Sequence, residues 1–124
     1  MNRAALLLMA PVLIAATPPQ PKQVILDSEA YPEAARNAGV EGDIAFDLAI
    51  DAKGVVTGCT VTKGADLPAG LAADACALAR INWRFLPARD DAGKKVPGTV
   101  HYAIAFRISL RCPPPDGQTV CVFL

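Results

Sequence analysis

The most regular alternation of hydrophobic and polar positions predicts a β-hairpin near the middle of the chain. Residues 43–50 carry apolar side chains at every second position, namely Ile44, Phe46, Leu48 and Ile50. A period of two is typical of a half-buried strand. Asp51–Gly54 predicts a turn, and residues 55–62 predict a second strand with Val55, Cys59 and Val61 on its apolar face.

The longest alternation, over residues 99–110, predicts the last strand of the sheet. Its apolar face carries Val100, Tyr102, Ile104, Phe106, Ile108 and Leu110. Its more polar face carries Thr99, His101, Ala103, Ala105, Arg107 and Ser109. We therefore expect one face of this strand in the core and the other nearer to solvent.

Two short helices complete the predicted fold. Pro32 and Gly39 bound a helix over 32–38, because proline suits a first helical turn and glycine a helix end. Residues 68–82 are rich in alanine and predict a second helix with Asp66 as its N-cap. Trp83 begins an extended segment, and residues 89–98 form a polar loop. The order predicts an α+β fold, with two short helices on one face of a small antiparallel sheet.

The N-terminal residues predict export. Arg3 precedes an apolar run over residues 4–16, which as a helix spans roughly 20 Å, less than the ~30 Å hydrocarbon core of a membrane. This pattern is typical of a signal peptide, here residues 1–16 with cleavage after Ala16, and places the protein in the periplasm. An uncleaved inner-membrane anchor is the alternative. The proline-rich start of residues 17–28 predicts an extended tether that is not packed.

Export changes the interpretation of the four cysteines, since disulfides persist in oxidising compartments. Cys59 lies on the strand face that the second helix must cover, and Cys76 is in the middle of that helix. We expect a Cys59–Cys76 disulfide, which leaves Cys112–Cys121 to tie a tail of residues 112–124 to the folded domain, 29–111. Zinc is the competing interpretation, but zinc sites usually show closely spaced cysteine pairs. A reactive thiol is a further alternative.

Charge and motifs give little support for a nucleic-acid binder or an enzyme. The sequence has 12 basic and 12 acidic residues, without the basic excess of a typical nucleic-acid binder. His101 is the only histidine, and Asp43, Asp47 and Asp51 fit a solvated strand face. The sequence shows no phosphate loop or nucleophile motif. We expect no catalytic residues, no metal and no cofactor.

The order of several short motifs resembles the TonB C-terminal domain family over about residues 29–109. These motifs are Tyr31-Pro32, Gly39, Glu41-Gly42, Gly54, Trp83-Arg84-Phe85, Pro87 and the strand Val100–Ile108. The resemblance implies a periplasmic domain in which the last strand is a sheet edge that pairs with a segment of an outer-membrane transporter. Family transducers also have a membrane anchor with a functional histidine and a long proline-rich spacer. In this sequence the apolar run is short, contains no histidine and has the pattern of a cleavable leader, and residues 17–21 are only a remnant of such a spacer.

The resemblance implies a partner-binding edge, and these two departures from the family pattern predict that the domain does not transmit force by itself. The predicted residues of the edge are Ser28, Val100, His101, Tyr102, Ala103, Ile104, Ala105, Phe106 and Arg107. The expected partner is a TonB-dependent outer-membrane transporter or another envelope protein, and the same edge would allow a weak homodimer. The alternative is a disulfide-stabilised structural or regulatory envelope protein without transporter contact. Pairing of the protein's own tail with the last strand would favour that alternative.

Overall fold

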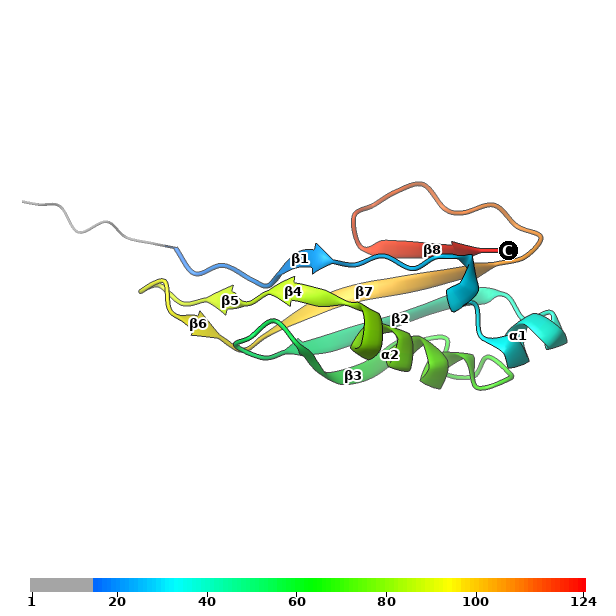
Figure 1. Cartoon of the computed structure of the whole chain (residues 1–124), viewed down its shortest axis with the longest axis horizontal. Coiled ribbons are helices and arrows are strands. Elements are labelled where there is room, and N and C mark those ends of the chain that lie inside the picture. Colours follow the sequence, from blue (N-terminus) through cyan, green and yellow to red (C-terminus); the bar gives the residue numbers. More distant parts are fainter. Residues whose placement is uncertain (1–14) are drawn as a thin grey trace, which may run out of the picture.

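A four-stranded sheet forms the centre of the computed structural model, which describes residues 15–124. The strand order is β3-β2-β7-β8, with β2 at Gly42–Ile50, β3 at Val56–Lys63, β7 at Gly98–Arg107 and β8 at Thr119–Phe123 (Figure 1). Strand β2 pairs antiparallel with both β3 and β7. The predicted α+β class and the predicted hairpin are confirmed.

The hairpin turn is built by Asp51 and Gly54. The Asp51 carboxylate accepts hydrogen bonds from the main-chain N–H groups of Val55 and Lys53, each at 2.9 Å, and these bonds lower the pKa of Asp51. Gly54 has a φ of +84°, and a Cβ at this position would lie 1.8 Å from the carbonyl oxygen of Phe85. Only glycine therefore fits where the turn packs against the next part of the chain.

A register shift in the hairpin changes which valine reaches the core. Ala49 pairs with Gly58, but Ile50 pairs with Val56. Because of this irregularity Val56 is buried, whereas Val55 is only half-buried. The predicted placement of Val55 on the core face is therefore wrong, while Cys59 still packs against the core.

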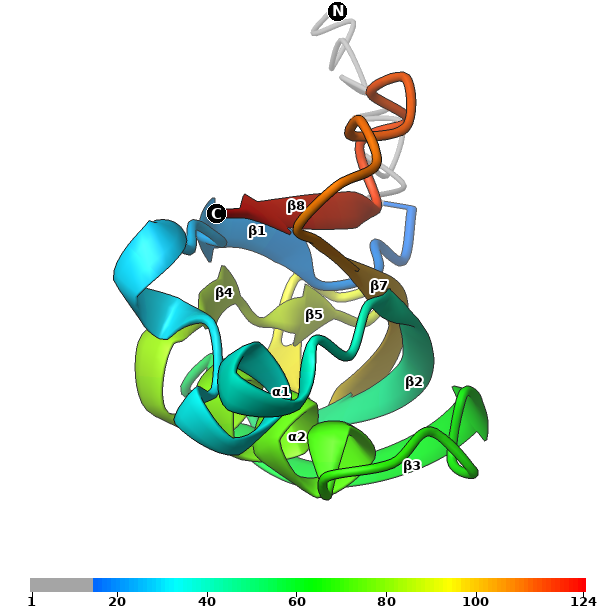
Figure 2. The ribbon, with the colours of Figure 1, turned by 90° about the vertical axis from the view of Figure 1, so that its right-hand side faces the viewer.

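Both predicted helices exist and pack on one face of the sheet (Figure 2). Helix α1 covers Glu33–Ala38 and ends at Gly39 in the left-handed conformation. Helix α2 covers Leu71–Asn82, so the predicted start at Pro68 is wrong. Its N-cap is Gly70, not Asp66, because Ala69 and Gly70 both have positive φ and cannot belong to a right-handed helix.

The core lies between this face of the sheet and the helices. Even-numbered residues of β2 and β7 point into it, as the alternation predicts. Trp83 is fully buried and contacts the rings of Phe46 and Tyr102, with centroids 5.8 and 5.4 Å apart. Tyr31 packs edge-on against Phe106 at 5.4 Å and donates its hydroxyl hydrogen to the Val40 carbonyl. Aromatic contacts thus join the helical layer to β7.

The proline-rich N-terminal segment is extended but packed, which corrects the predicted tether. Strand β1, Gln20–Gln23, pairs antiparallel with β4, Arg84–Leu86, and Thr17 exchanges two main-chain hydrogen bonds with Arg89. The side chain of Pro19 is buried. The proline content of residues 17–28 predicted an extended segment but gave no sign that its main chain pairs with β4. Most of the predicted signal peptide, residues 1–14, lies outside the described residues.

The predicted polar loop after β4 contains a small hairpin of its own. Strands β5, Ala88–Arg89, and β6, Lys95–Val96, pair antiparallel. The Asp90 carboxylate accepts hydrogen bonds from the N–H groups of Ala92 and Lys94 and closes the turn between the strands. Within residues 15–124, none of the helices is long and apolar enough to cross a membrane.

The C-terminal tail adds a strand that the sequence analysis did not predict. Strand β8 pairs with β7 in the parallel direction, so the sheet is mixed and not purely antiparallel. The connection over residues 108–118 passes on the far side of β7 from the helices (Figure 2). Strand β7 ends at Arg107 and not at Leu110. Both predicted disulfides, Cys59–Cys76 and Cys112–Cys121, are present, and no free cysteine remains.

Candidate functional site: the outer edge of β7

The main chain of β7 divides its residues into two sets. The N–H of Ala103 donates to the carbonyl of Gln118 at 2.9 Å, and the carbonyl of Arg107 accepts from the N–H of Leu124 at 3.1 Å. Because N–H and C=O groups of alternate residues in a strand point to opposite sides, the odd-numbered residues face outward, away from β2. The even-numbered residues direct their main chain to β2 and their side chains to the core.

This division locates the residues of the predicted edge. Among the predicted residues, those with an outward main chain are His101, Ala103, Ala105 and Arg107. The main-chain groups of the other four, Val100, Tyr102, Ile104 and Phe106, face β2. These four residues thus support the edge from inside the fold, and Thr99, which was not among the predicted residues, belongs to its outward set.

The two halves of the outer edge differ in occupancy. Residues 103–107 pair with β8, in a register from Ala103↔Thr119 to Arg107↔Phe123. Residues 98–102 have no strand on their outer side within the part of the chain that the structure describes. The main-chain groups of Thr99 and His101 therefore face outward without a ladder partner. The tail covers half of the edge and leaves the other half open.

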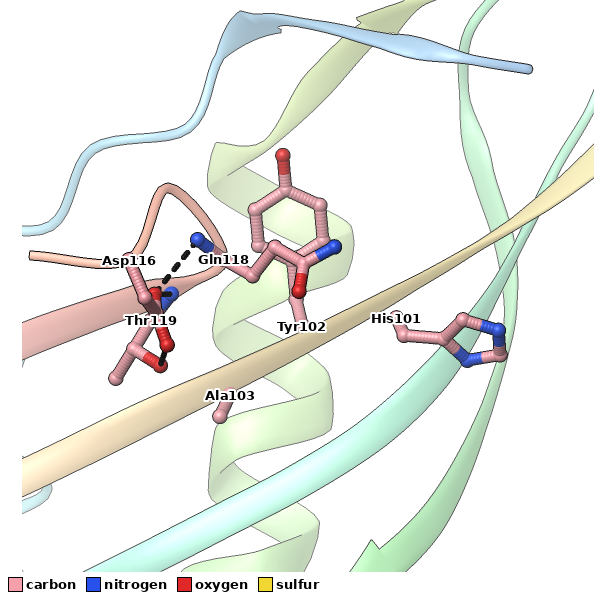
Figure 3. A pocket seen from close by; sticks show the side chains of 6 residues that line it. All are labelled: His101, Tyr102, Ala103, Asp116, Gln118 and Thr119. Atoms are coloured by element: carbon pink, nitrogen blue, oxygen red, sulfur yellow. Dashed lines mark hydrogen bonds between the residues drawn. The ribbon is translucent and has the colours of Figure 1, made fainter.

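The open half borders a groove, which we call the edge groove. It has a volume of about 410 Å³ and lies between the N-terminal segment Pro18–Pro21 and the β7 residues Thr99–Tyr102, with Gly117 and Gln118 at one end. A smaller hollow of about 220 Å³ adjoins it and extends to Asp116 and Thr119 (Figure 3). Tyr102 points its hydroxyl toward the N-terminal segment (Figure 3). Burial raises the pKa of Tyr102, so this hydroxyl keeps its proton.

The polar side chains of β7 are held on the open face of the sheet. The imidazole Nδ1 of His101 contacts the Asp47 carboxylate, and the Arg107 guanidinium lies 2.7 Å from the Asp43 carboxylate. Asp47 and His101 are directly opposite in the β2–β7 register, whereas Arg107 reaches diagonally to Asp43, which is registered with Ala105. His101 is largely exposed, whereas the Arg107 side chain is mostly covered. His101 is therefore the more accessible of the two.

Two carboxylates hold the ends of the tail connection. Glu41 accepts hydrogen bonds from the N–H groups of Ile108 and Ser109, and from the Ser109 hydroxyl at 3.0 Å. These hydrogen bonds lower the pKa of Glu41 to about 2. The capture of these N–H groups by a carboxylate explains why β7 stops before Ile108.

Asp116 plays the same part at the other end of the connection. Its carboxylate accepts from the N–H groups of Gln118 and Thr119, at 2.8 and 2.7 Å, and from the Thr119 hydroxyl at 2.9 Å. These bonds lower the pKa of Asp116. Asp116 thus fixes the start of β8 beside the edge groove (Figure 3).

Ser28 lies at the other end of the covered edge. It begins a short 3-10 helix, Ser28–Ala30, whose N-cap Asp27 accepts the N–H of Glu29 at 3.1 Å. This helix contacts β8. Ser28 is exposed, and its helix lies beside the tail strand. The edge groove is formed by other residues.

The sequence analysis missed the tail strand, although a signal was present. Val120 and Val122 alternate with Thr119, Cys121 and Phe123, which is a short strand pattern. The structure buries Val122 and packs Val120 against the core. Residues 15–124 contain no cluster of three or more potential metal ligands, and the Cys59–Cys76 pair is occupied by its own bond.

Comparison with known proteins gives a family match. The model of the family described as Gram-negative bacterial TonB protein C-terminal matches residues 27–108, which is more than half of the chain. No curated protein and no solved structure matches the chain. The matched range ends one residue after β7, so the tail and its disulfide lie beyond it.

Proposed function

Since this chain belongs to the family of Gram-negative bacterial TonB protein C-terminal domains, we propose that it is a periplasmic binding domain for an outer-membrane transporter. In this proposal an extended segment of the transporter adds to the outer edge of β7 at the edge groove. The observation that carries the proposal is the pair of outward main-chain positions at Thr99 and His101, which have no strand partner among residues 15–124.

Strand addition suits this edge on physical grounds. Unpaired N–H and C=O groups in a row bind another backbone with little demand on its sequence. The opposite wall of the edge groove contains Pro18, Pro19 and Pro21, which have no N–H to donate. These three residues therefore do not compete for the carbonyl groups of β7 through their main chain, and Gln20, which also lines this wall, pairs with Leu86 of β4. The Tyr102 hydroxyl adds a donor inside the groove.

Export to the periplasm is part of the proposal. Cleavage after Ala16 would leave Thr17 as the first residue, and Thr17 pairs with Arg89 next to the β5–β6 hairpin. Such a protein would be a soluble binding domain without a transmembrane connection to an inner-membrane motor. It would assist or compete with a full-length transducer at the transporter, and it would not transmit force itself.

The occupancy of residues 103–107 favours a second candidate function. Because β8 already pairs with this half of the edge, the protein also fits a structural or regulatory envelope protein that has no transporter contact. The two candidates differ in what happens at the open half. Only the first needs the outward N–H groups of Thr99 and His101.

Proline substitution tests that need. Proline removes an N–H and is tolerated where that N–H faces solvent, so Thr99→Pro with His101→Pro should leave the fold intact. We expect capture of outer-membrane transporters from solubilised envelopes, identified by mass spectrometry, to fall at least tenfold. The matched control is Thr99→Val with His101→Val, which also loses the His101–Asp47 contact but keeps both N–H groups. Equal capture by the two variants would refute strand addition at this edge.

A further inference from the structure

The tail strand β8 occupies the same row of main-chain groups that a partner strand would use. Its register runs from Ala103↔Thr119 to Arg107↔Phe123, directly beyond the open positions Thr99 and His101. A segment that enters at the edge groove can therefore extend past His101 only if β8 leaves. The tail is in the position of an intramolecular competitor.

Strand β8 lies at the edge of the sheet, and the main contacts among the other core elements do not depend on it. Its most buried side chain is Val122, at 1% exposure, while Phe123 next to it is 47% exposed. The four main elements of the core, β2, β3, α2 and β7, contact one another without it. Loss of β8 would uncover the outward main-chain groups of residues 103–107 and the part of the core that Val122 and Val120 contact, which a partner strand with alternating apolar side chains could cover again.

The Cys112–Cys121 disulfide shortens the tether of this competitor. Along the chain, Cys121 lies fourteen positions after Arg107, the last residue of β7, whereas Cys112 lies only five positions after it. The bond therefore connects the middle of β8 to the end of β7 through a much shorter path. Glu41 holds the first residues of this path in place. A shorter and fixed tether raises the effective concentration of β8 at the edge.

We infer that the tail is a disulfide-controlled gate: with Cys112–Cys121 closed, β8 blocks residues 103–107, and with the bond open, β8 exchanges with a partner strand. This inference rests on the proposed function, because it assigns the regulation of the same edge. In the gate disulfide Cys112 is an exposed residue of an irregular loop and only Cys121 is half-buried, whereas Cys59 and Cys76 are both half-buried, in a strand and a helix. The gate disulfide is thus the more accessible of the two.

Opening requires a dithiol as the reductant. One thiolate of the dithiol attacks a sulfur of Cys112–Cys121, which breaks the S–S bond and forms a mixed disulfide. The second thiolate attacks the mixed disulfide and releases the second cysteine sulfur. The dithiol loses two electrons and forms its own disulfide, and its two protons pass to the sulfurs of Cys112 and Cys121, which become thiols.

A peptide of residues 116–124 with Cys121→Ser provides the probe, because it carries the β8 contacts in a separate molecule. We expect it to bind the full-length Cys112→Ser/Cys121→Ser variant at least tenfold more tightly than the oxidised native protein, by fluorescence anisotropy. Adding Val122→Asn to this variant should strengthen peptide binding further, since the protein's own tail loses its buried anchor. The matched control, Cys59→Ser/Cys76→Ser, keeps the gate closed and should bind the peptide as the native protein does.

The signal of the buried Trp83 in near-ultraviolet circular dichroism shows whether each variant is folded. Equal peptide affinity of the folded gate-open and native proteins would overturn the inference. The same variants distinguish it from the proposed function. Peptide binding that follows the gate, without any transporter capture, would refute the transporter and retain the gate. Transporter capture that is equal in both gate states would refute the gate and retain the transporter.

Discussion

The two disulfides are the same kind of bond, but one joins two elements of the core and the other joins two parts of the C-terminal tail. Cys59–Cys76 joins β3 to α2, with a sequence separation of 17 positions. Cys112–Cys121 has a sequence separation of 9 positions within the tail, and it joins the crossover connection to the last strand. The first bond links two elements on which the core is built. The second links two parts of the C-terminal segment, which adds Val122 and Val120 to that core from the edge of the sheet.

A disulfide can therefore stabilise the folded core in one region and, in another, hold a strand on the edge of a sheet. A cross-link that restricts the unfolded chain stabilises every element that unfolds with it. A cross-link inside a segment that can detach locally changes the free energy of that local detachment more than the free energy of global unfolding. The family match covers the first region and stops before the second, so the tail with its disulfide is an addition to the domain that defines the family.

The largest effect should come from a comparison of the two cysteine pairs. Cys59→Ala with Cys76→Ala should lower the free energy of unfolding by about 3 kcal/mol, the size expected for a loop of this length. Cys112→Ala with Cys121→Ala should lower it less, because the tail can detach before the core unfolds. Urea denaturation followed by Trp83 fluorescence measures both. A larger loss from the tail pair would contradict the division into core and tail.

A smaller and pH-dependent effect should come from Glu41. Hydrogen bonds from residues 108–110 lower its pKa to about 2 from the model-compound value of 4.5. Since the folded value lies below the unfolded one, its contribution is complete above about pH 4.5 and is lost as the pH falls toward 2. Glu41→Gln should remove this pH dependence and speed amide exchange in the tail at neutral pH.

Hydrogen exchange of Thr119–Phe123 between pH 2 and 7 provides the measurement. The amides of β2 serve as an internal control, because their ladder with β3 does not involve Glu41. The native protein and Glu41→Gln are compared after correction for the intrinsic exchange rates. If exchange of the tail amides follows the same pH profile in both proteins, Glu41 does not hold the connection.

Much of the core was predictable because it depends on local patterns. The alternation in β2 and β7 and the helical spacing of Leu71 and Ala75 were sufficient to place these elements. The pairing of Cys59 with Cys76 followed, because the helix that carries one must cover the strand that carries the other. These are consequences of periodicity, which the sequence displays directly.

The errors occurred where distant segments meet or where the local backbone departs from regular structure. The packed N-terminal segment depends on β4, more than sixty positions later in the chain, and the start of α2 depends on the positive φ of Ala69 and Gly70. The tail strand depends on an open row of groups on β7. At the candidate site, the sequence located the strand but not its two halves, because the occupancy of an edge is a property of pairing and not of the strand itself.

Site-specific photo-crosslinking in living cells tests the central claim most directly. A photoreactive amino acid at Thr99, on the open half of β7, should crosslink to an outer-membrane transporter that mass spectrometry identifies. The matched control is Thr60 on β3, an exposed position on the opposite side of the same sheet, which should give no such adduct. Transporter adducts from position 60 with none from position 99 would contradict the assignment of the β7 edge as the binding site.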